Sequence, residues 1–259
     1  MTTVAQAFAT ARAEYRAALI GYLPAGFPTK SGAIECISAM VAGGVDIVEI
    51  GLPYSDPLMD GITIQEAVQT SLENGTKIID VIDTVGKVSK LGVATLVMSY
   101  WNPIERFGVT KFSEQLQAAG GVGVITPDLT PEEAGAWITA TDANGIDRVF
   151  LVALSSTDQR LATVASATTG FVYAGAVMGV TGARSALGDS VKEVVARTRE
   201  FTDLPIAVGL GVSTAEQAHE IAKYADGVIV GSAFINAINS GGPAAAKELA
   251  EKLRAGVQR

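Results

Sequence analysis

Short apolar runs alternate with helical patterns along the whole chain, and this alternation constrains the fold more than any other feature. The runs are continuously apolar, which is typical of parallel strands that are buried on both faces. Eight strands separated by helices, in 259 residues without a linker, predict a single (β/α)8 TIM barrel over residues 1–259. The expected strands are Ala18–Leu23, Val45–Ile50, Ala94–Ser99, Val122–Thr126, Arg148–Val152, Phe171–Ala174, Ile206–Val208 and Gly227–Val230.

An extra amphipathic helix precedes the first expected strand, and we expect it to close the bottom of the barrel. An open, doubly wound sheet is the alternative, although such a sheet usually has fewer strands. The other expected helices are Gly32–Ala42, Thr63–Glu73, Ile78–Lys90, Lys111–Ala119, Pro131–Ala143, Gln159–Ala167, Ser190–Glu200, Thr214–Lys223 and Ala244–Leu253, with a short one in the stretch GSAFINAI.

Composition limits the classes of partner. The formal net charge of −8 argues against nucleic acid, because binding to its backbone needs clustered Lys and Arg. An anionic small ligand remains possible, since local amide groups can hold a phosphate on an acidic protein. No apolar run approaches the roughly 18 residues of a membrane span, and the amphipathic start lacks the features of a signal peptide. The only cysteine, Cys36, excludes an internal disulfide, so we expect a cytoplasmic protein.

The single histidine, His219, lies in the helical stretch STAEQAHEIAKYA and is expected to be a surface or packing residue. With one His and one Cys, a metal site built from imidazole or thiolate is not expected. A Ser-His-Asp triad is equally disfavoured, because His219 is the only imidazole that it could use. We therefore expect neither a metal nor a triad.

One strand end carries an acid into a loop that contains further acids. Glu49 lies in the apolar strand Val45–Ile50, and the following loop brings Asp56 and Asp60 before the next helix. A buried Glu is costly unless it is paired or protonated. Two carboxylates in different environments can have different pKa values and so divide acid and base roles. The structural alternative is that Glu49 points outward and that the aspartates only form turns.

Polar side chains follow other strands. Tyr22 ends the first strand, Tyr100 and Asn102 follow the third, Asp128 follows the fourth and Tyr173 lies in the sixth. In a barrel the active site lies at the carboxyl ends of the strands. We therefore expect these groups to meet Glu49 on one rim.

Three glycine clusters follow the last three expected strands: GVTGARS from Gly179, GLGVS from Gly209 and GSA from Gly231. Glycine lets backbone N–H groups approach a ligand closely, and a helix N-terminus adds its positive end. Barrels commonly bind phosphate at the loops after strands 7 and 8. Together the clusters predict a phosphate site.

These residues resemble the tryptophan synthase alpha chain family over essentially the whole chain. Its signature is the strand-2 glutamate followed by a G-x-P-[FY]-S-D-P-x-x-D-G loop, which reads EIGLPYSDPLMDG from Glu49 to Gly61. The resemblance also includes YWNP from Tyr100, PDL from Pro127 and the three glycine clusters. It implies cleavage of indole-3-glycerol phosphate to indole and glyceraldehyde 3-phosphate, without a metal or a cofactor in this chain.

The resemblance also implies roles. Glu49 would protonate indole C3 and remove the proton of the adjacent glycerol hydroxyl, and Asp60 would stabilise the positive charge at the indole N–H. Tyr173 and Thr181 would orient Asp60. The indole pocket would be lined by Tyr22, Met98, Tyr100 and Leu151, with Tyr173 beside it, and the phosphate would be bound by Gly182, Gly211, Gly231 and Ser232.

A partner follows from the same resemblance. The family passes indole through a tunnel to a beta chain that carries pyridoxal phosphate, in an alpha2beta2 assembly, with Pro53 and Asp56 at the contact. Three positions depart from the usual family pattern: Met59 stands where alanine is common, and Ile62 and Leu154 where proline is common. None of them removes a catalytic group, but Ile62 puts the positioning of Asp60, and hence the rate, in question.

Other functions share parts of this pattern. Phosphate-binding isomerases of the histidine or tryptophan pathways carry similar glycine clusters, but they place their catalytic groups on other strand ends. A Schiff-base aldolase is disfavoured because no lysine lies at an expected strand end. A standalone lyase that releases free indole and a non-catalytic phosphate-sensing subunit also remain as alternatives, the latter disfavoured by the presence of both Glu49 and Asp60.

Overall fold

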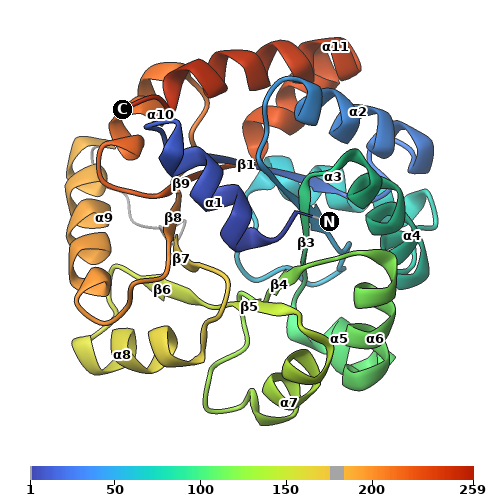
Figure 1. Ribbon diagram of the computed structural model, residues 1–259. Helices are drawn as coiled ribbons and strands as arrows, with labels where there is room; N and C mark the ends of the chain where they lie inside the picture. Colours follow the sequence, from blue (N-terminus) through green and yellow to red (C-terminus); the bar gives the residue numbers. More distant parts are fainter. Residues whose placement is uncertain (1, 176–183) are drawn as a thin grey trace.

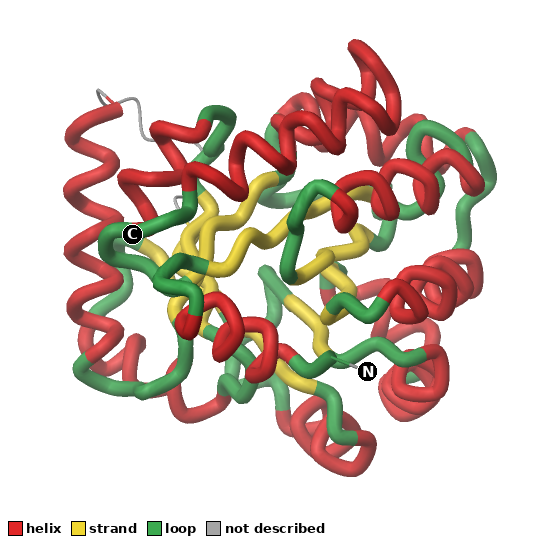
Figure 2. Tube along the Cα trace, turned by 45° about the horizontal axis from the view of Figure 1, so that its top comes forward, coloured by secondary structure: helices red, strands yellow, loops and turns green. Residues whose placement is uncertain are grey.

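The computed structural model describes residues 2–175 and 184–259. Within these residues, nine parallel strands form one sheet in the order β5-β4-β3-β2-β1-β9-β8-β7-β6. The strands curl into a central ring, and the helices surround it (Figure 2). The strands are β1 (Ala18–Pro24), β2 (Ile47–Gly51), β3 (Ala94–Met98), β4 (Gly123–Ile125), β5 (Asp147–Val149), β6 (Leu151–Ala153), β7 (Val172–Gly175), β8 (Ile206–Gly209) and β9 (Gly227–Val230).

The sheet closes at β5 and β6, which are separated only by Phe150. Thr126 donates its backbone N–H to Val149 on one side, and Tyr173 donates its backbone N–H to Phe150 on the other. The single strand expected over Arg148–Val152 is therefore wrong in detail. The stagger of a barrel pairs the first half with β4 and the second half with β7. Eight strand positions and the predicted barrel remain.

Helices follow the strands as expected, with three corrections. The helix expected from Ser190 begins six residues earlier, at Arg184. α5 was not predicted, because its seven residues include Pro103. Proline is tolerated there, since N–H groups in a first helical turn have no intrahelical partner. The helix expected from Pro131 begins only at Gly135, after a turn. The helices are α1 (Val4–Ala13), α2 (Lys30–Ala42), α3 (Ile62–Glu73), α4 (Ile78–Val88), α5 (Trp101–Phe107), α6 (Val109–Ala119), α7 (Gly135–Asn144), α8 (Asp158–Ala167), α9 (Arg184–Arg199), α10 (Ala215–Ala222) and α11 (Ser232–Gly256), with a 3-10 turn at Ser89–Leu91.

The last helix, α11, is broken by Gly241 and Gly242, whose backbone angles are not helical. This break separates the short helix that begins at Ser232 from the helix expected over Ala244–Leu253. Both predictions are confirmed.

α1 crosses one end of the barrel (Figure 1). Its buried residues Val4, Ala7, Phe8 and Ala11 follow helical spacing and join the cluster that fills the barrel interior. The ring centroids of Phe8 and Phe171 lie 5.6 Å apart. Because α1 precedes β1, it covers the amino ends of the strands and leaves the carboxyl ends for the site.

Candidate active site

Glu49 lies in the middle of β2 and faces the barrel interior. Its neighbours in register are Tyr22 on β1 and Leu96 on β3. Side chains alternate along a strand, so Glu49 points the same way as Ile47, which belongs to the interior cluster. Only 1% of its surface is exposed. The alternative of an outward-facing glutamate is therefore wrong.

The environment of Glu49 favours its neutral form. Its Oε1 is buried and has no hydrogen-bond partner among the described residues. Burial raises the pKa of this carboxyl from 4.5 to about 8, because the charged form loses its hydration. At neutral pH Glu49 therefore holds a proton that it can donate, and its pKa lies close to the pH at which proton transfer in both directions is efficient.

Asp60 lies on the loop between β2 and α3 and is half-buried. Burial raises its pKa above 3.8, and a hydrogen bond with the Tyr100 side chain opposes this increase. The Tyr100 hydroxyl also accepts the backbone N–H of Met59 at 3.0 Å. Burial raises the pKa of Tyr100 to about 12, so the hydroxyl remains a hydrogen-bond donor for the Asp60 carboxylate. Tyr100 thus holds both the side chain of Asp60 and the backbone beside it.

Two tyrosine rings lie over glycines at the carboxyl end of the barrel. A Cβ at Gly51 would overlap the ring of Tyr22, whose Cζ would be 2.7 Å away. A Cβ at Gly209 would overlap the ring of Tyr173 in the same way, with Cζ at 2.9 Å. The absence of side chains at these two positions therefore gives the rings their places above the barrel core.

Electrostatic interactions show that the two carboxylates and the two rings form one cluster. The pKa of Tyr22 lies well above its usual value because of burial, and then because of Asp60 and Glu49. The pKa of Tyr173 is raised by burial and then by the same carboxylates, Glu49 and Asp60. Each ring therefore lies within electrostatic reach of both acids. These four side chains therefore lie near one another at the carboxyl end of the barrel.

Apolar side chains complete the wall of this cluster. Met98 ends β3 and pairs with Gly51 and Ile125, and Leu151 pairs with Tyr173. Both side chains are partly buried against the interior cluster. An aromatic ligand placed over Glu49 would have apolar surface on both sides.

The glycines expected to bind phosphate follow β8 and β9, which lie in the sheet between β7 with Tyr173 and β1 with Tyr22. Gly211 follows β8 with φ of +61° and has open space where a Cβ would stand. Gly231 follows β9 and is the N-cap of α11, without a capping side chain, and Ser232 is the first residue of that helix. Backbone N–H groups are therefore available at a helix N-terminus near the site, as anion binding requires. Thr181 and Gly182 lie outside the described residues.

The loop that carries Asp60 is tied to the first turn of α5. The ring of Tyr54 packs on that of Tyr100 with centroids 5.6 Å apart, and Asn102 Nδ2 donates to the Tyr54 hydroxyl at 3.0 Å. Pro53 is buried at the start of the loop, whereas Asp56 is exposed and accepts the Ser55 hydroxyl at 2.6 Å. Sequence reasoning did not find the contact of Tyr54 with Asn102.

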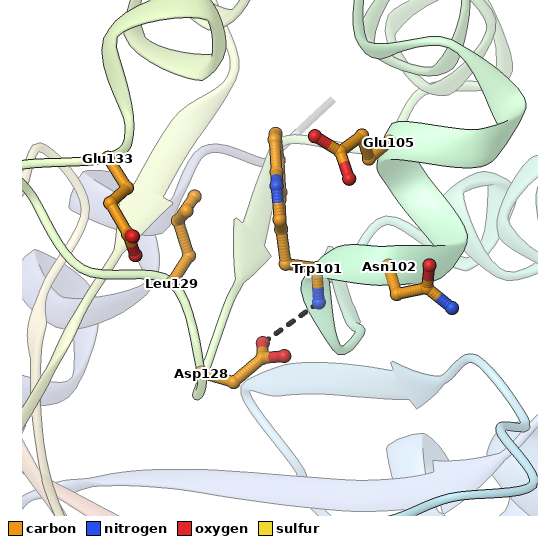
Figure 3. A pocket seen from close by; sticks show the side chains of 6 residues that line it. All are labelled: Trp101, Asn102, Glu105, Asp128, Leu129 and Glu133. Carbon is orange, nitrogen blue, oxygen red and sulfur yellow. Dashed lines mark hydrogen bonds between the residues drawn. The ribbon is translucent and has the colours of Figure 1, made fainter.

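A cavity of about 380 Å³ lies beside this turn, between the loops that follow β3 and β4. Asp128 reaches across from the β4 loop and accepts the backbone N–H of Trp101 at 2.8 Å (Figure 3). The residues lining it are Trp101, Asn102, Glu105, Asp128, Leu129 and Glu133. Asp128 therefore lies on the expected rim, but it contacts α5 rather than Glu49 or Asp60.

In the described part of the chain, no group of three or more His, Cys, Asp or Glu side chains is arranged to hold a metal ion. No helix among the same residues is long and apolar enough to cross a membrane.

Comparison with known proteins identifies the family. The sequence profile named Tryptophan synthase alpha chain matches residues 8–258. The chain belongs to the tryptophan synthase alpha chain family. Alpha chains from Acidothermus cellulolyticus and Thermobifida fusca are 52% and 56% identical, over 100% and 90% of this chain and 98% and 88% of theirs. A tryptophan synthase structure from Mycobacterium tuberculosis matches with a TM-score of 0.94 at 46% identity, covering 100% of both chains.

Membership in the tryptophan synthase alpha chain family establishes the activity. The chain is a lyase of tryptophan biosynthesis that cleaves indole-3-glycerol phosphate to indole and glyceraldehyde 3-phosphate, and it acts as the alpha subunit of tryptophan synthase. The isomerase, aldolase, standalone-lyase and phosphate-sensing alternatives are not favoured by these similarities.

Proposed function

We propose that Glu49 and Asp60 carry out the cleavage. The protonated Glu49 donates its proton to indole C3, which leaves a positively charged ring whose N–H is stabilised by the Asp60 carboxylate. The Glu49 carboxylate then removes the proton of the glycerol hydroxyl. The O–H electrons form the aldehyde C=O, and the electrons of the breaking carbon–carbon bond restore the aromatic indole. The observation that carries this proposal is the buried Glu49 with its pKa of about 8.

The apolar side chains and the glycine loops at the carboxyl end of the barrel orient the substrate in this proposal. The indole ring lies over Glu49 among Tyr22, Met98, Tyr100, Leu151 and Tyr173. The phosphate binds at Gly211, Gly231 and Ser232, and the proposal includes Gly182. Thr181 and Tyr173 orient Asp60 in this proposal. The structure adds Tyr100 as the residue that hydrogen-bonds with Asp60.

The proposed chemistry needs no cofactor in this chain, because two carboxylates supply both proton transfers and the charge stabilisation. Pyridoxal phosphate belongs to the beta chain, with which the alpha chain forms an alpha2beta2 assembly in the cytoplasm. The contact includes Pro53 and Asp56, which lie on the loop that carries Asp60. Docking of the beta chain on this loop would reduce the entropy that the loop loses when it closes over substrate.

Indole release from indole-3-glycerol phosphate tests the proposal. Glu49→Gln should lower kcat by at least roughly 10⁴-fold, since one group performs both proton transfers. A variant within threefold of wild type would show that Glu49 is not the proton donor.

A beta-chain titration tests the partner. Beta chain from the same organism should raise kcat by at least roughly tenfold, which lowers the activation free energy of the cleavage by about 1.4 kcal/mol. Asp56→Ala should weaken this activation while leaving the basal rate near wild type. Rates that stay flat, with binding confirmed independently, would instead indicate a standalone lyase.

A further inference from the structure

Asp128 is an acidic residue at the carboxyl end of the barrel that the proposed chemistry does not use. It follows β4, is half-buried, and directs Oδ1 at the backbone N–H of Trp101, 2.8 Å away. Burial raises the pKa of this carboxyl above 3.8, and the bond from Trp101 opposes the increase. The contact joins the loop after β4 to the helix after β3 (Figure 3).

The N-terminus of α5 depends on this outside acceptor. Its N-cap residue, Tyr100, makes no side-chain capping bond. Asp128 therefore takes the place of a capping side chain and satisfies one of the N–H groups that a helix leaves without an intrahelical partner. Ser99, just before this turn, donates its N–H to Ile125, so that β4 and the loop after it hold the chain on both sides of Tyr100.

The same first turn of α5 holds the loop of Asp60 at two points. The Tyr100 hydroxyl accepts Met59 N–H and bonds with Asp60. Asn102 Nδ2 donates to the Tyr54 hydroxyl at 3.0 Å. A displacement of this turn would therefore move Asp60 directly.

We propose that Asp128 is a positioning residue for Asp60, acting through the capped first turn of α5 and the side chain of Tyr100. Its role rests on an acceptor oxygen at the right place rather than on its negative charge. The proposal depends on the proposed function only through the role of Asp60.

The decisive pair of variants is Asp128→Asn and Asp128→Glu. Asn keeps an acceptor oxygen at the same distance from the backbone and removes the charge. Glu keeps the charge and moves the oxygens by one methylene. We expect Asn to retain kcat within about threefold of wild type, and Glu and Asp128→Ala to lose roughly tenfold, with KM changed less than about twofold, because misplacement of a catalytic group lowers turnover. If Asp128→Glu were active and Asp128→Asn were impaired, the proposal would be overturned.

The pH profile separates positioning from stability. If Tyr100 shifts, Asp60 loses the hydrogen bond that lowers its pKa, so the acid limb of kcat should move to higher pH in Asp128→Ala and Asp128→Glu but not in Asp128→Asn. Thr3→Ala is the matched control, because it removes the N-cap acceptor of Gln6 N–H at the opposite end of the barrel. It should lower Tm and leave kcat unchanged.

All variants are assayed as the complex with the beta chain, after folding is checked by circular dichroism. Asp128→Ala with wild-type kcat and acid limb but a lower Tm would make Asp128 only a structural cap and overturn the proposal. Asp60→Asn with a wild-type kcat would instead refute the role of Asp60 in the proposed function. The Asn and Glu pair decides the question even where Asp128→Ala does not fold.

Discussion

Glu49→Gln provides a thermodynamic test of the site that does not depend on turnover. Burial raises the pKa of the Glu49 carboxyl from 4.5 to about 8 in the folded chain. The folded state therefore binds this proton more tightly than the unfolded state does, and the free energy of unfolding falls as pH rises between these two values. At about 1.36 kcal/mol for each tenfold change in acidity, the full loss is about 5 kcal/mol.

Glutamine has the size of glutamate but does not ionise, so the free energy of unfolding of the variant does not fall with pH for this reason. Its free energy of unfolding relative to wild type should increase by about 4 kcal/mol from pH 5 to pH 9, with most of the gain below pH 8. A buried amide without partners adds a cost of roughly 1–3 kcal/mol, but that cost does not depend on pH. The slope against pH is therefore the informative quantity, and the offset is not.

Urea unfolding, followed by tryptophan fluorescence and circular dichroism at pH 5, 7 and 9, measures this slope. Glu66→Gln is the control, because Glu66 is exposed on α3, and it should stay within about 0.5 kcal/mol of wild type throughout. A difference between Glu49→Gln and wild type that stays constant from pH 5 to pH 9 would refute the assignment of a neutral buried carboxyl.

Three further predictions concern activity. The pH profile of kcat/KM should fall on the alkaline side near pH 8, as Glu49 loses its proton, and on the acid side at a pH above 3.8, as Asp60 gains one; full activity at pH 10 would contradict this. Asp60→Asn should lower kcat severely and change KM much less, because the charge is needed mainly in the transition state; a raised KM with intact kcat would make Asp60 a binding residue. Gly211→Val should raise KM for indole-3-glycerol phosphate, because valine is strained at φ of +61°, and should leave binding of free indole nearly unchanged in a fluorescence titration, because no side chain lies near this Cβ; equal loss of indole binding would place the phosphate elsewhere.

The sequence predicts the barrel well because its signal is local and repeated. The apolar runs form strands, and β1 is buried on both faces, with seven buried residues in succession. Glu49 is also predictable, because an acid inside such a run must face either the barrel interior or the surrounding helices, and both are costly without a role. The short helix α5 is harder to predict from the sequence, since a stretch with a proline in its first turn resembles a loop.

The contacts that hold Asp60 could not be predicted in the same way. Tyr54, Tyr100, Asn102 and Asp128 come from the three segments that follow β2, β3 and β4, and their contacts depend on the register of these strands. A shift by one residue would turn each strand's side chains to the other face. Sequence patterns can thus place these residues on one rim, but only the structure shows which of them touch.

Gly51 illustrates a requirement that the sequence hides completely, and it leads to a last prediction. In the sequence Gly51 belongs to the loop motif, but in the structure it ends β2 beneath the ring of Tyr22, whose Cε2 would lie 2.8 Å from an added Cβ. Tyr22 is only 6% exposed and cannot move aside freely, so Gly51→Ala should destabilise the fold by roughly 1–3 kcal/mol. Tyr22→Leu shortens the ring side chain and should relieve the overlap, so the double variant should be more stable than the sum of the two single changes by at least about 0.5 kcal/mol in urea unfolding. Gly86→Ala, on α4, is the control of opposite sign. An added Cβ there would lie no nearer than 3.8 Å to any atom, so alanine should stabilise the helix by about 0.5–1 kcal/mol. Additive effects of Gly51→Ala and Tyr22→Leu would show that the glycine is required by the backbone of β2 and not by the ring above it.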